Sequence, residues 1–298
     1  MTTSDRTVVI TGGTGGLGRE CARALAADSR WTVVATGRDA DRGRAEAATI
    51  GARGMALDLG ALASVAHFAD ELRTNGLPPL RALVCNAGLQ FTRRSYTTDG
   101  VEATFGVNHL GHLALVQALL DDLLAPARIV FVTSGTHDPD HFTGMPHPLD
   151  TNVRRLAYPP EPTESAQRDG RRRYSTSKLA NLQTTYELAR QLAGRGITVN
   201  AFDPGLMPGT GLARDAGAAA KLLWRTVARG LVLLPGVNTP RRSGADLARL
   251  VTDPALAEVT GQHFVGRTAT PSSKASYDRA AQHALYADSL ELLGELTH

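Results

Sequence analysis

The sequence predicts a single doubly wound α/β domain, in which a parallel sheet of about seven strands is covered by helices on both faces. Short apolar runs alternate with longer helical patterns along the chain. Runs such as VVIT and RIVFVT are almost continuously apolar, which is typical of strands that are buried on both faces. A glycine-rich turn follows the first of these runs, at the end of a strand where such a sheet binds its ligand.

The strands and the helices between them can be assigned in order. The expected strands are residues 7–11, 31–36, 54–57, 82–85, 128–133, 198–202 and 263–265. Helical patterns occupy residues 17–27, 39–49, 62–74, 100–124 and 174–193. This alternation predicts one domain over residues 1–298, with the informative residues at the carboxyl ends of the strands.

The composition of the chain excludes several classes of protein. It has 298 residues, of which 42% are hydrophobic and 20% are charged, as in a globular protein with a substantial core. The net charge of +3 suits an anionic cofactor but is too small to indicate nucleic acid as a partner. A small-molecule substrate is the expected partner, and a homodimer is left open.

The sequence favours a cytoplasmic protein. It has no run of about 18 apolar residues that would predict a membrane span. The first residues, MTTSDRTVVITGG, lack the apolar stretch of a signal peptide. The two cysteines, Cys21 and Cys85, imply no disulfide framework, which fits a reducing compartment.

The stretch TGGTGGLG, residues 11–18, lies between the first expected strand and the first expected helix. Its glycines allow a tight turn and let a pyrophosphate approach the backbone, while the helix points its N-terminus at the phosphates. With a strand before it and a helix after it, the turn predicts a Rossmann-type dinucleotide site. The expected contacts in the turn are Gly12, Thr14, Gly15, Gly16, Leu17 and Gly18.

The residues after the next three strands predict which dinucleotide binds. After the second strand comes Arg38, whose guanidinium can pair with a 2′-phosphate, and this favours NADP(H) over NAD. Asp39 follows, and it is equally suited to cap the next helix. The expected contacts after the third and fourth strands are Asp58, Leu59, Asn86, Ala87 and Gly88.

The stretch RRRYSTSKLAN, residues 171–181, places Tyr174 four residues before Lys178, so the two side chains share one helix face. An ammonium beside the phenol favours the phenolate and lowers the pKa of the tyrosine from its usual value of about 10. The pair can therefore act as a general acid and base, or it can belong to an ordinary exposed helix start. The stretch alone leaves both interpretations open.

Six short motifs occur in sequence along the chain: TGGTGGLG at 11–18, CNAG at 85–88, VNHLGH at 107–112, VTS at 132–134, YSTSK at 174–178 and DPG at 203–205. In this order and at these spacings they resemble the short-chain dehydrogenase/reductase family. The stretches DGVEATFGVNHLGHLAL, PGTGLAR and SYDRAAQHALYADSLELL look like the branch that includes retinol dehydrogenases and light-dependent protochlorophyllide reductases.

The resemblance implies a catalytic set of four residues. Tyr174 would be the acid/base, and Lys178 would hold the nicotinamide ribose and lower the pKa of the tyrosine. Ser134 would hydrogen-bond the substrate oxygen, and Asn108 would kink its helix and hold a water of the proton relay. The chemistry agrees with these roles, because hydride transfer leaves an alkoxide that a nearby donor stabilises.

The resemblance also implies that the residues after the sixth strand border the nicotinamide and a cofactor phosphate. Pro204, Gly205 and Met207 would lie beside the nicotinamide. Many family members have a phosphate-binding threonine five residues after the proline. Here that position is Gly209 and Thr210 follows, so the contact could come from either residue, and Thr210 is the expected one.

Two segments are expected to shape the substrate pocket. Residues 135–173 form a loop several times longer than in many family members, and we expect this loop to be an active-site insertion. Residues 206–238 follow the sixth strand, where the family carries a substrate lid, and the stretch AAAKLLWRTVARGLVLL within them can equally be an amphipathic helix that packs on the core. Arg171–Arg173, at the end of the insertion, is expected to be a solvated face. The histidines of the insertion have no acid or cysteine cluster beside them, so no metal site is expected.

Together these features predict an NADP(H)-dependent oxidoreductase that acts on the carbonyl or alcohol group of a lipophilic small molecule. One alternative is a noncatalytic NADP(H)-binding sensor on the same fold. Another is a ring double-bond reductase of the protochlorophyllide reductase type. In that type a cysteine lies two residues after the active-site lysine, and here the position is Ala180.

Overall fold

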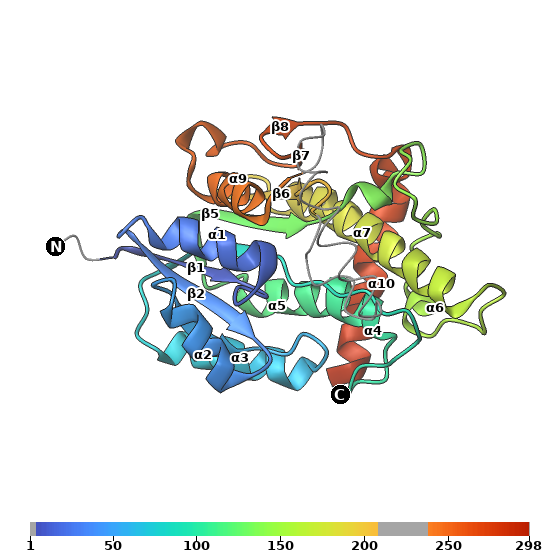
Figure 1. The fold of residues 1–298 in the computed structure, drawn as a ribbon, viewed down its shortest axis with the longest axis horizontal. Coiled ribbons are helices and arrows are strands. Elements are labelled where there is room, and N and C mark those ends of the chain that lie inside the picture. The colour runs from blue at the N-terminus through green and yellow to red at the C-terminus, as the bar shows by residue number, and fades with distance from the viewer. Residues whose placement is uncertain (1–3, 208–237, 298) are drawn as a thin grey trace.

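A computed structural model describes residues 4–207 and 238–297 of the chain (Figure 1). Its centre is a sheet of eight strands in the order β3-β2-β1-β4-β5-β6-β7-β8. All neighbouring strands are parallel except the short final pair, β7 and β8. The strands are β1 (Arg6–Ile10), β2 (Trp31–Gly37), β3 (Arg53–Ala56), β4 (Leu80–Cys85), β5 (Leu123–Val132), β6 (Ile197–Asp203), β7 (His263–Val265) and β8 (Thr268–Ala269).

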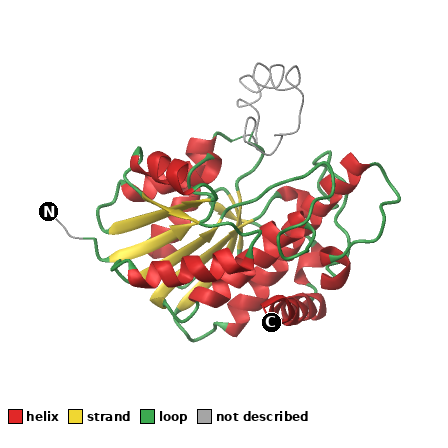
Figure 2. Ribbon diagram, turned by 90° about the horizontal axis from the view of Figure 1, so that it is seen from below, coloured by secondary structure: helices red, strands yellow, loops and turns green. Residues whose placement is uncertain are grey.

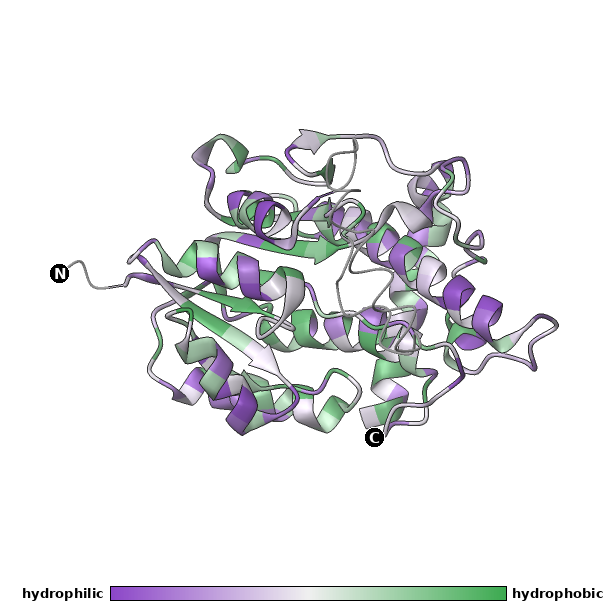
Figure 3. Cartoon of the chain, in the orientation of Figure 1, coloured by the Kyte–Doolittle hydropathy of each residue, from purple (hydrophilic) through white to green (hydrophobic). Residues whose placement is uncertain are grey.

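Helices cover both faces of the sheet, and this confirms the predicted fold class (Figure 2). Alternate strand residues face opposite layers: Val9 packs in one core cluster, while Val8 and Ile10 pack in the other. The first cluster includes α3 (Leu62–Thr74), α5 (Gly111–Leu119) and the end of α7 (Ala166–Gln191). The second includes α1 (Gly16–Ala26), α2 (Ala40–Ala48) and α9 (Pro240–Thr252). The hydrophobic strands and the more hydrophilic outer helices can be followed in Figure 3.

The helix that was predicted over residues 100–124 is shorter and is divided. It consists of α4 (Ala103–Phe105), a π-helical segment η1 (Gly106–Leu110) and α5. β5 already begins at Leu123, which pairs with Leu80 of β4. Here the pairing of Leu123 with β4 outweighs the local helical pattern. Such pairing between distant segments cannot be recognised from one stretch of sequence.

The insertion at residues 135–173 contains more regular structure than a loop. It holds the 3-10 turn η2 (Gly135–His137), the short helix α6 (Val153–Ala157) and the first two turns of α7. α7 was predicted to start at residue 174, but Ser165 caps it by accepting a hydrogen bond from the Arg168 amide. The polar sequence of these first turns lacks the apolar period that marks a helix, so they could not be predicted from a hydrophobic pattern.

Two further segments complete the described chain. One is the 3-10 turn η4 (Pro254–Leu256), which precedes β7. The other is the 3-10 turn η5 (Lys274–Tyr277), which leads into the last helix, α10 (Arg279–Thr297). α10 packs along α5 and α7: Tyr286 accepts a hydrogen bond from Gln117, and Ser289 contacts His109. None of the helices within residues 4–207 and 238–297 is both long enough and apolar enough to cross a membrane.

The close packing of α1 on α9 depends on Gly244, and a substitution there should destabilise the protein. A Cβ at Gly244 would lie 2.5 Å from Cβ of Glu20 and 2.8 Å from the amide nitrogen of Cys21. We expect Gly244→Ala to lower the free energy of unfolding by about 1–3 kcal/mol in urea titrations. Gly294→Ala is the matched control on α10, where a Cβ has open space. It should stabilise the protein by up to about 1 kcal/mol, because alanine favours helix. Equal effects of the two substitutions would contradict this prediction.

Candidate active site

The residues that the sequence singles out gather at the carboxyl edge of the sheet. Because the central strands are parallel, the loops that follow β1, β4, β5 and β6 all open at this edge. The glycine turn follows β1, which lies beside β4, where the order of strands reverses. Arg38 follows β2, Asp58 and Leu59 follow β3, and Pro204, Gly205 and Met207 follow β6. Thr210 and most of the expected lid lie outside the described residues.

The glycine turn has the geometry of an anion cradle. Gly12 and Gly16 have positive φ values of 63° and 52°, which favour glycine. A Cβ at Gly18 would lie 2.4 Å from the Gly12 carbonyl oxygen, so the turn can close only on glycine. By contrast, Gly15 and Gly16 face open space. α1 begins here without a side-chain cap and without an acid in its first turn, so its amides are available to a phosphate.

Thr11, at the end of β1, ties the turn to the neighbouring strand and helix. Its Oγ1 accepts hydrogen bonds from the amides of Asn86 (2.8 Å) and Ala87 (2.9 Å). The same oxygen lies 2.8 Å from Nε2 of His112, whose Nδ1 lies 3.0 Å from the Asn108 carbonyl oxygen. Burial lowers the pKa of His112 to about 3, so the ring is neutral. Nδ1 therefore donates to the carbonyl, and Nε2 accepts from the threonine hydroxyl.

Asn108 lies in the π-helical segment η1, fully buried. Its side chain accepts a hydrogen bond from the Leu89 amide and donates one to the Leu89 carbonyl, both at 2.9 Å. It also donates to the hydroxyl of Ser177 (3.0 Å), which in turn donates to the Tyr174 carbonyl (2.7 Å). The asparagine therefore connects the loop after β4 to α7. Such π segments are frequent at functional sites.

Tyr174 and Lys178 lie on one face of α7, against the end of β5. The Lys178 ammonium is 5.4 Å from the centroid of the Tyr174 ring. It donates a hydrogen bond to the Val132 carbonyl, and the Thr133 hydroxyl donates one to the Lys178 carbonyl, both at 3.0 Å. Both side chains are buried, with Tyr174 7% exposed and Lys178 3% exposed. Ser134 follows Thr133 directly and is hydrogen-bonded to Tyr174, so the tyrosine contacts both of the other expected residues.

Burial dominates the ionisation of this site. It raises the pKa of Tyr174, the nearby Asp203 carboxylate raises it further, and a hydrogen bond with Ser134 acts in the opposite direction. Burial also lowers the pKa of Lys178 to about 8, against the influence of Asp203. Without cofactor, the pKa of Tyr174 is therefore shifted in the opposite direction to the lowering that the sequence predicts from Lys178. The phenol is protonated at neutral pH.

Three residues of this region were not among the expected site residues. Asp203 ends β6 and is buried, and its Oδ1 accepts a hydrogen bond from the Gly205 amide at 2.8 Å. His137 and His263 are also buried, with ring centroids 5.2 Å apart. The DPG motif contains Asp203, so that residue could have been proposed from its place at a strand end. His137 was considered only as a metal ligand, and nothing in the sequence places it beside β7.

The expectation that Arg171–Arg173 is a solvated face was wrong. Arg173 is 6% exposed and forms ion pairs with Glu102 and, at 3.1 Å, with Asp169. Glu102 also caps α4 by accepting hydrogen bonds from its first amides. A buried guanidinium requires such partners, because the loss of hydration is costly. Asp169 lies one turn earlier on α7, but Glu102 lies on a distant segment, so the run of three arginines does not reveal the burial of Arg173.

Arg171 and Arg172, at the start of α7, bind other parts of the insertion. Arg172 pairs with Glu164 at 2.8 Å, and Arg171 donates to the Gly144 carbonyl at 2.6 Å. A cavity of about 330 Å³ lies between the insertion and the start of α7. Its lining combines apolar and charged side chains and includes Phe105, Leu149, Leu156, Pro159, Arg173 and Ser177.

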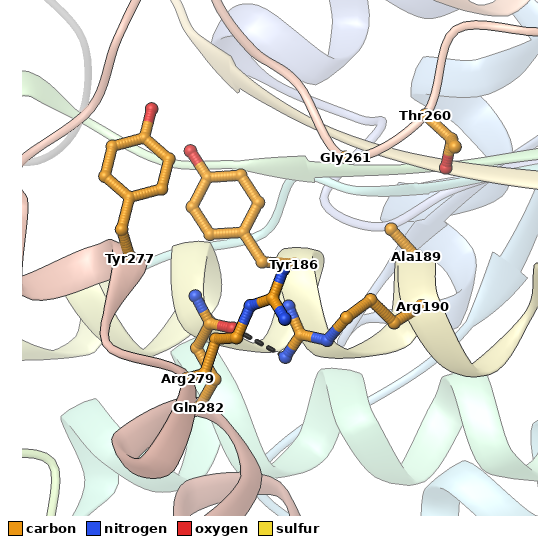
Figure 4. Close-up of a pocket in the computed structure, with 8 residues that line it drawn as sticks. All are labelled: Tyr186, Ala189, Arg190, Thr260, Gly261, Tyr277, Arg279 and Gln282. Atoms are coloured by element: carbon orange, nitrogen blue, oxygen red, sulfur yellow. Dashed lines mark hydrogen bonds between the residues drawn. The ribbon is translucent and has the colours of Figure 1, made fainter.

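A second pocket, of about 300 Å³, lies at the far end of α7 (Figure 4). The rings of Tyr186 and Tyr277 stand side by side there, and Arg190 is hydrogen-bonded to Gln282. Tyr174 and Ser134 do not line this pocket. The arrangement therefore belongs to the packing of the C-terminal segment on α7.

Comparisons with known proteins agree with this geometry. The model of the short chain dehydrogenase family matches residues 6–144. Protochlorophyllide reductase A, chloroplastic, of Oryza sativa subsp. japonica is 35% identical over 84% of this chain and 70% of its own length. Retinol dehydrogenase 13 of Homo sapiens is 32% identical over 97% of this chain and 85% of its own length. A short chain dehydrogenase of Burkholderia cenocepacia J2315, solved in complex with NADP, has a TM-score of 0.62 and 27% identity, and the similarity covers 88% of this chain and 96% of that one.

The buried Lys178 should reduce the stability of the protein when no cofactor is bound. Because its pKa falls from 10.5 to about 8 on folding, the cost is fully present below pH 8 and disappears as the pH rises towards 10.5. We expect Lys178→Met to raise the free energy of unfolding at pH 7, by up to about 3 kcal/mol. The gain should shrink between pH 8 and pH 10.5 in denaturant titrations. The exposed Lys274 offers the control, since Lys274→Met should have almost no effect. A loss of stability in Lys178→Met at pH 7 would contradict the prediction.

Proposed function

Because this chain belongs to the short-chain dehydrogenase/reductase family, in its retinol dehydrogenase and protochlorophyllide reductase branch, we propose that it interconverts a carbonyl and an alcohol with NADP(H). The substrate is a lipophilic small molecule. The observation that carries the proposal is the placement of Tyr174 beside Lys178 and in hydrogen-bonding contact with Ser134, at the carboxyl edge of the sheet, where the glycine turn also lies.

The residues act on the substrate oxygen. When bound, the nicotinamide supplies or accepts the hydride. Ser134 donates a hydrogen bond to the oxygen, and Tyr174 gives it a proton as negative charge develops. Burial keeps the phenol protonated until that moment, which is the state that a proton donor needs. The Lys178 ammonium stabilises the phenolate that is left behind, and it holds a ribose hydroxyl.

The residues at the ends of β1 and β2 fit NADP(H). The open space at Gly15 and Gly16 and the uncapped start of α1 suit a pyrophosphate. Arg38 is exposed, and within the described residues no acid pairs with its guanidinium, which leaves it available for a 2′-phosphate. Asp39 instead caps α2, where it accepts a hydrogen bond from the Arg42 amide at 3.0 Å. A carboxylate committed to a helix cap does not compete for the ribose, and this favours NADP(H) over NAD.

The insertion at 135–173 forms one wall of the substrate site in this proposal. Its backbone is bonded to α7 next to the tyrosine, because the Leu149 amide donates to the Thr176 hydroxyl at 2.9 Å. The cavity beside it has apolar side chains and prolines on one part of its lining and charged side chains on the rest, and neither Tyr174 nor Ser134 lines it, so the lipophilic character of the substrate rests on the similarity to retinol dehydrogenase. Residues 206–238, most of which lie outside the described chain, are proposed as the lid.

Reduction of a ring double bond is the second candidate, and the similarity to protochlorophyllide reductase favours it. Ala180 speaks against it. This residue stands where that type of enzyme has a cysteine, and it is fully buried in a cluster with Phe105 and Leu285. No thiol can therefore reach the substrate from this position.

Removal of the Tyr174 hydroxyl should abolish most of the activity and leave the cofactor site intact. Purified protein is tested for NADPH oxidation with a panel of lipophilic ketones and aldehydes. We expect Tyr174→Phe to lower kcat by about 10²–10⁴, the usual contribution of a positioned acid. NADPH affinity should be unchanged in calorimetry. Tyr158→Phe, at an exposed tyrosine of the insertion, should match the wild type. Full turnover in Tyr174→Phe would leave the sensor or another catalytic site as the better interpretation.

Arg38 should determine the choice between the two nicotinamide cofactors. We expect NADPH to bind at least about tenfold more tightly than NADH, because a charge-assisted pair contributes about 1.5–3 kcal/mol. Arg38→Ala should remove the preference and leave NADH binding nearly unchanged in calorimetry. The control is Arg53→Ala, an exposed arginine at the start of β3. Equal affinities of the wild type for NADPH and NADH would refute this assignment.

A further inference from the structure

His137 connects the expected substrate-binding serine to the C-terminal part of the chain. It ends the short turn η2, which Ser134 caps, and it is 3% exposed. Its Nδ1 lies 2.7 Å from the Ser134 carbonyl oxygen, and its Nε2 lies 3.2 Å from the Ser273 amide nitrogen. An amide can only donate and a carbonyl can only accept. The ring must therefore be neutral, with its proton on Nδ1.

The C-terminal end of this connection is fixed to the helix that carries Tyr174. The Tyr186 hydroxyl lies 2.6 Å from the Ser272 hydroxyl, and the Tyr186 ring stacks on Tyr277 (Figure 4). Gln183 donates a hydrogen bond to the Ala275 carbonyl at 3.1 Å. Both Gln183 and Tyr186 belong to α7. The Ser273 amide is thus held in a fixed position relative to Tyr174.

Two contacts orient the Ser134 side chain. Its hydroxyl accepts a long hydrogen bond, 3.5 Å, from the Thr136 amide, and it is hydrogen-bonded to Tyr174. The alignment of the hydroxyl with Tyr174 therefore depends on where the backbone of η2 holds it. That backbone is held from outside by the His137 ring, which joins the Ser134 carbonyl to the segment anchored on α7.

We propose that His137 is a positioning residue that aligns Ser134 with Tyr174, and that it does so only while its ring is neutral. This role rests on the proposed function, because Ser134 and Tyr174 must act on the same substrate oxygen. A hydrogen-bond donor displaced by about 1 Å can cost up to about 10² in rate. Protonation of Nε2 would place two donors opposite each other and break the contact with Ser273.

The groups around His137 set the pH at which its ring is protonated. Burial lowers the pKa of His137, the bond to Ser134 and the carboxylates of Asp203 and Asp138 raise it, and His141 lowers it. His263 of β7 packs edge-on against the ring, and the two imidazoles disfavour each other's charge. The net pKa lies below the usual value of about 6.5, so the neutral form prevails at pH 7. Folding stability should fall as the pH drops below that usual value, because the unfolded chain binds the proton first.

Two substitutions at His137 separate positioning from packing. His137→Phe keeps the ring and removes both polar contacts. His137→Asn places an amide donor near the position of Nδ1 and cannot be protonated at acid pH. With NADPH and one carbonyl substrate, we expect His137→Phe to lower kcat by about tenfold or more with little change in KM. His137→Asn has no acceptor for the Ser273 amide, so it should lower kcat to a similar extent at neutral pH, and it should lose the acid limb that the wild type shows in its pH–rate profile.

The controls use the two neighbouring histidines. The side chain of His141, in the same loop, is 82% exposed, and His141→Asn should match the wild type throughout. His263→Asn keeps a donor for the Thr270 carbonyl and should retain the acid limb, shifted to higher pH because a neighbouring positive charge is gone.

Three outcomes would overturn the role of His137. They are wild-type kcat in folded His137→Phe, an acid limb that persists in His137→Asn, or an acid limb that disappears only in His263→Asn. If His137→Phe does not fold, the pH profile of His137→Asn still decides. A wild-type protein that binds NADPH but turns over no carbonyl would instead overturn the proposed function, and the role of His137 with it.

Discussion

The buried ammonium of Lys178 is the constraint on which the arrangement of the site depends. A charge that leaves water must find partners, and here the Val132 carbonyl accepts from it while the Asp203 carboxylate balances it. Both partners lie at the ends of neighbouring strands, so α7 must dock where β5 and β6 finish. The position of Tyr174, one turn earlier on the same helix, follows from this docking.

Much of the fold could be predicted because its signals are local. Continuous apolar runs marked the central strands, and the glycine turn marked the start of α1. The failures occurred where contacts between distant segments override the local pattern. Leu123 and Leu124 read as helix but begin β5. The polar first turns of α7 carry no apolar period, yet their arginines are neutralised by acids from other segments.

In the candidate site, too, the residues with local sequence signals could be predicted and those that depend on distant contacts could not. Four of the six motifs directly follow a strand and so lie at the carboxyl edge of the sheet, and the other two lie on helices that contact this edge. The residues that hold them in place could not be expected, because their partners are far away in sequence. Thr11 meets His112, and His137 meets Ser273, and neither pairing has a spacing that could be recognised. A histidine in a long polar loop reads as exposed until the structure shows what packs on it.

The packing of α10 and the turn before it on α5 and α7 has a consequence for synthesis. The ribosome adds residues 272–297 after every strand of the sheet. Until they emerge, the buried surfaces of Phe105, His109 and Tyr186 remain exposed to water or to chaperones. All strands of the described sheet and the glycine turn precede this segment in the chain. The helix that carries the tyrosine can be enclosed only when this last segment packs on it, so a chain that lacks the segment would leave one face of that helix exposed.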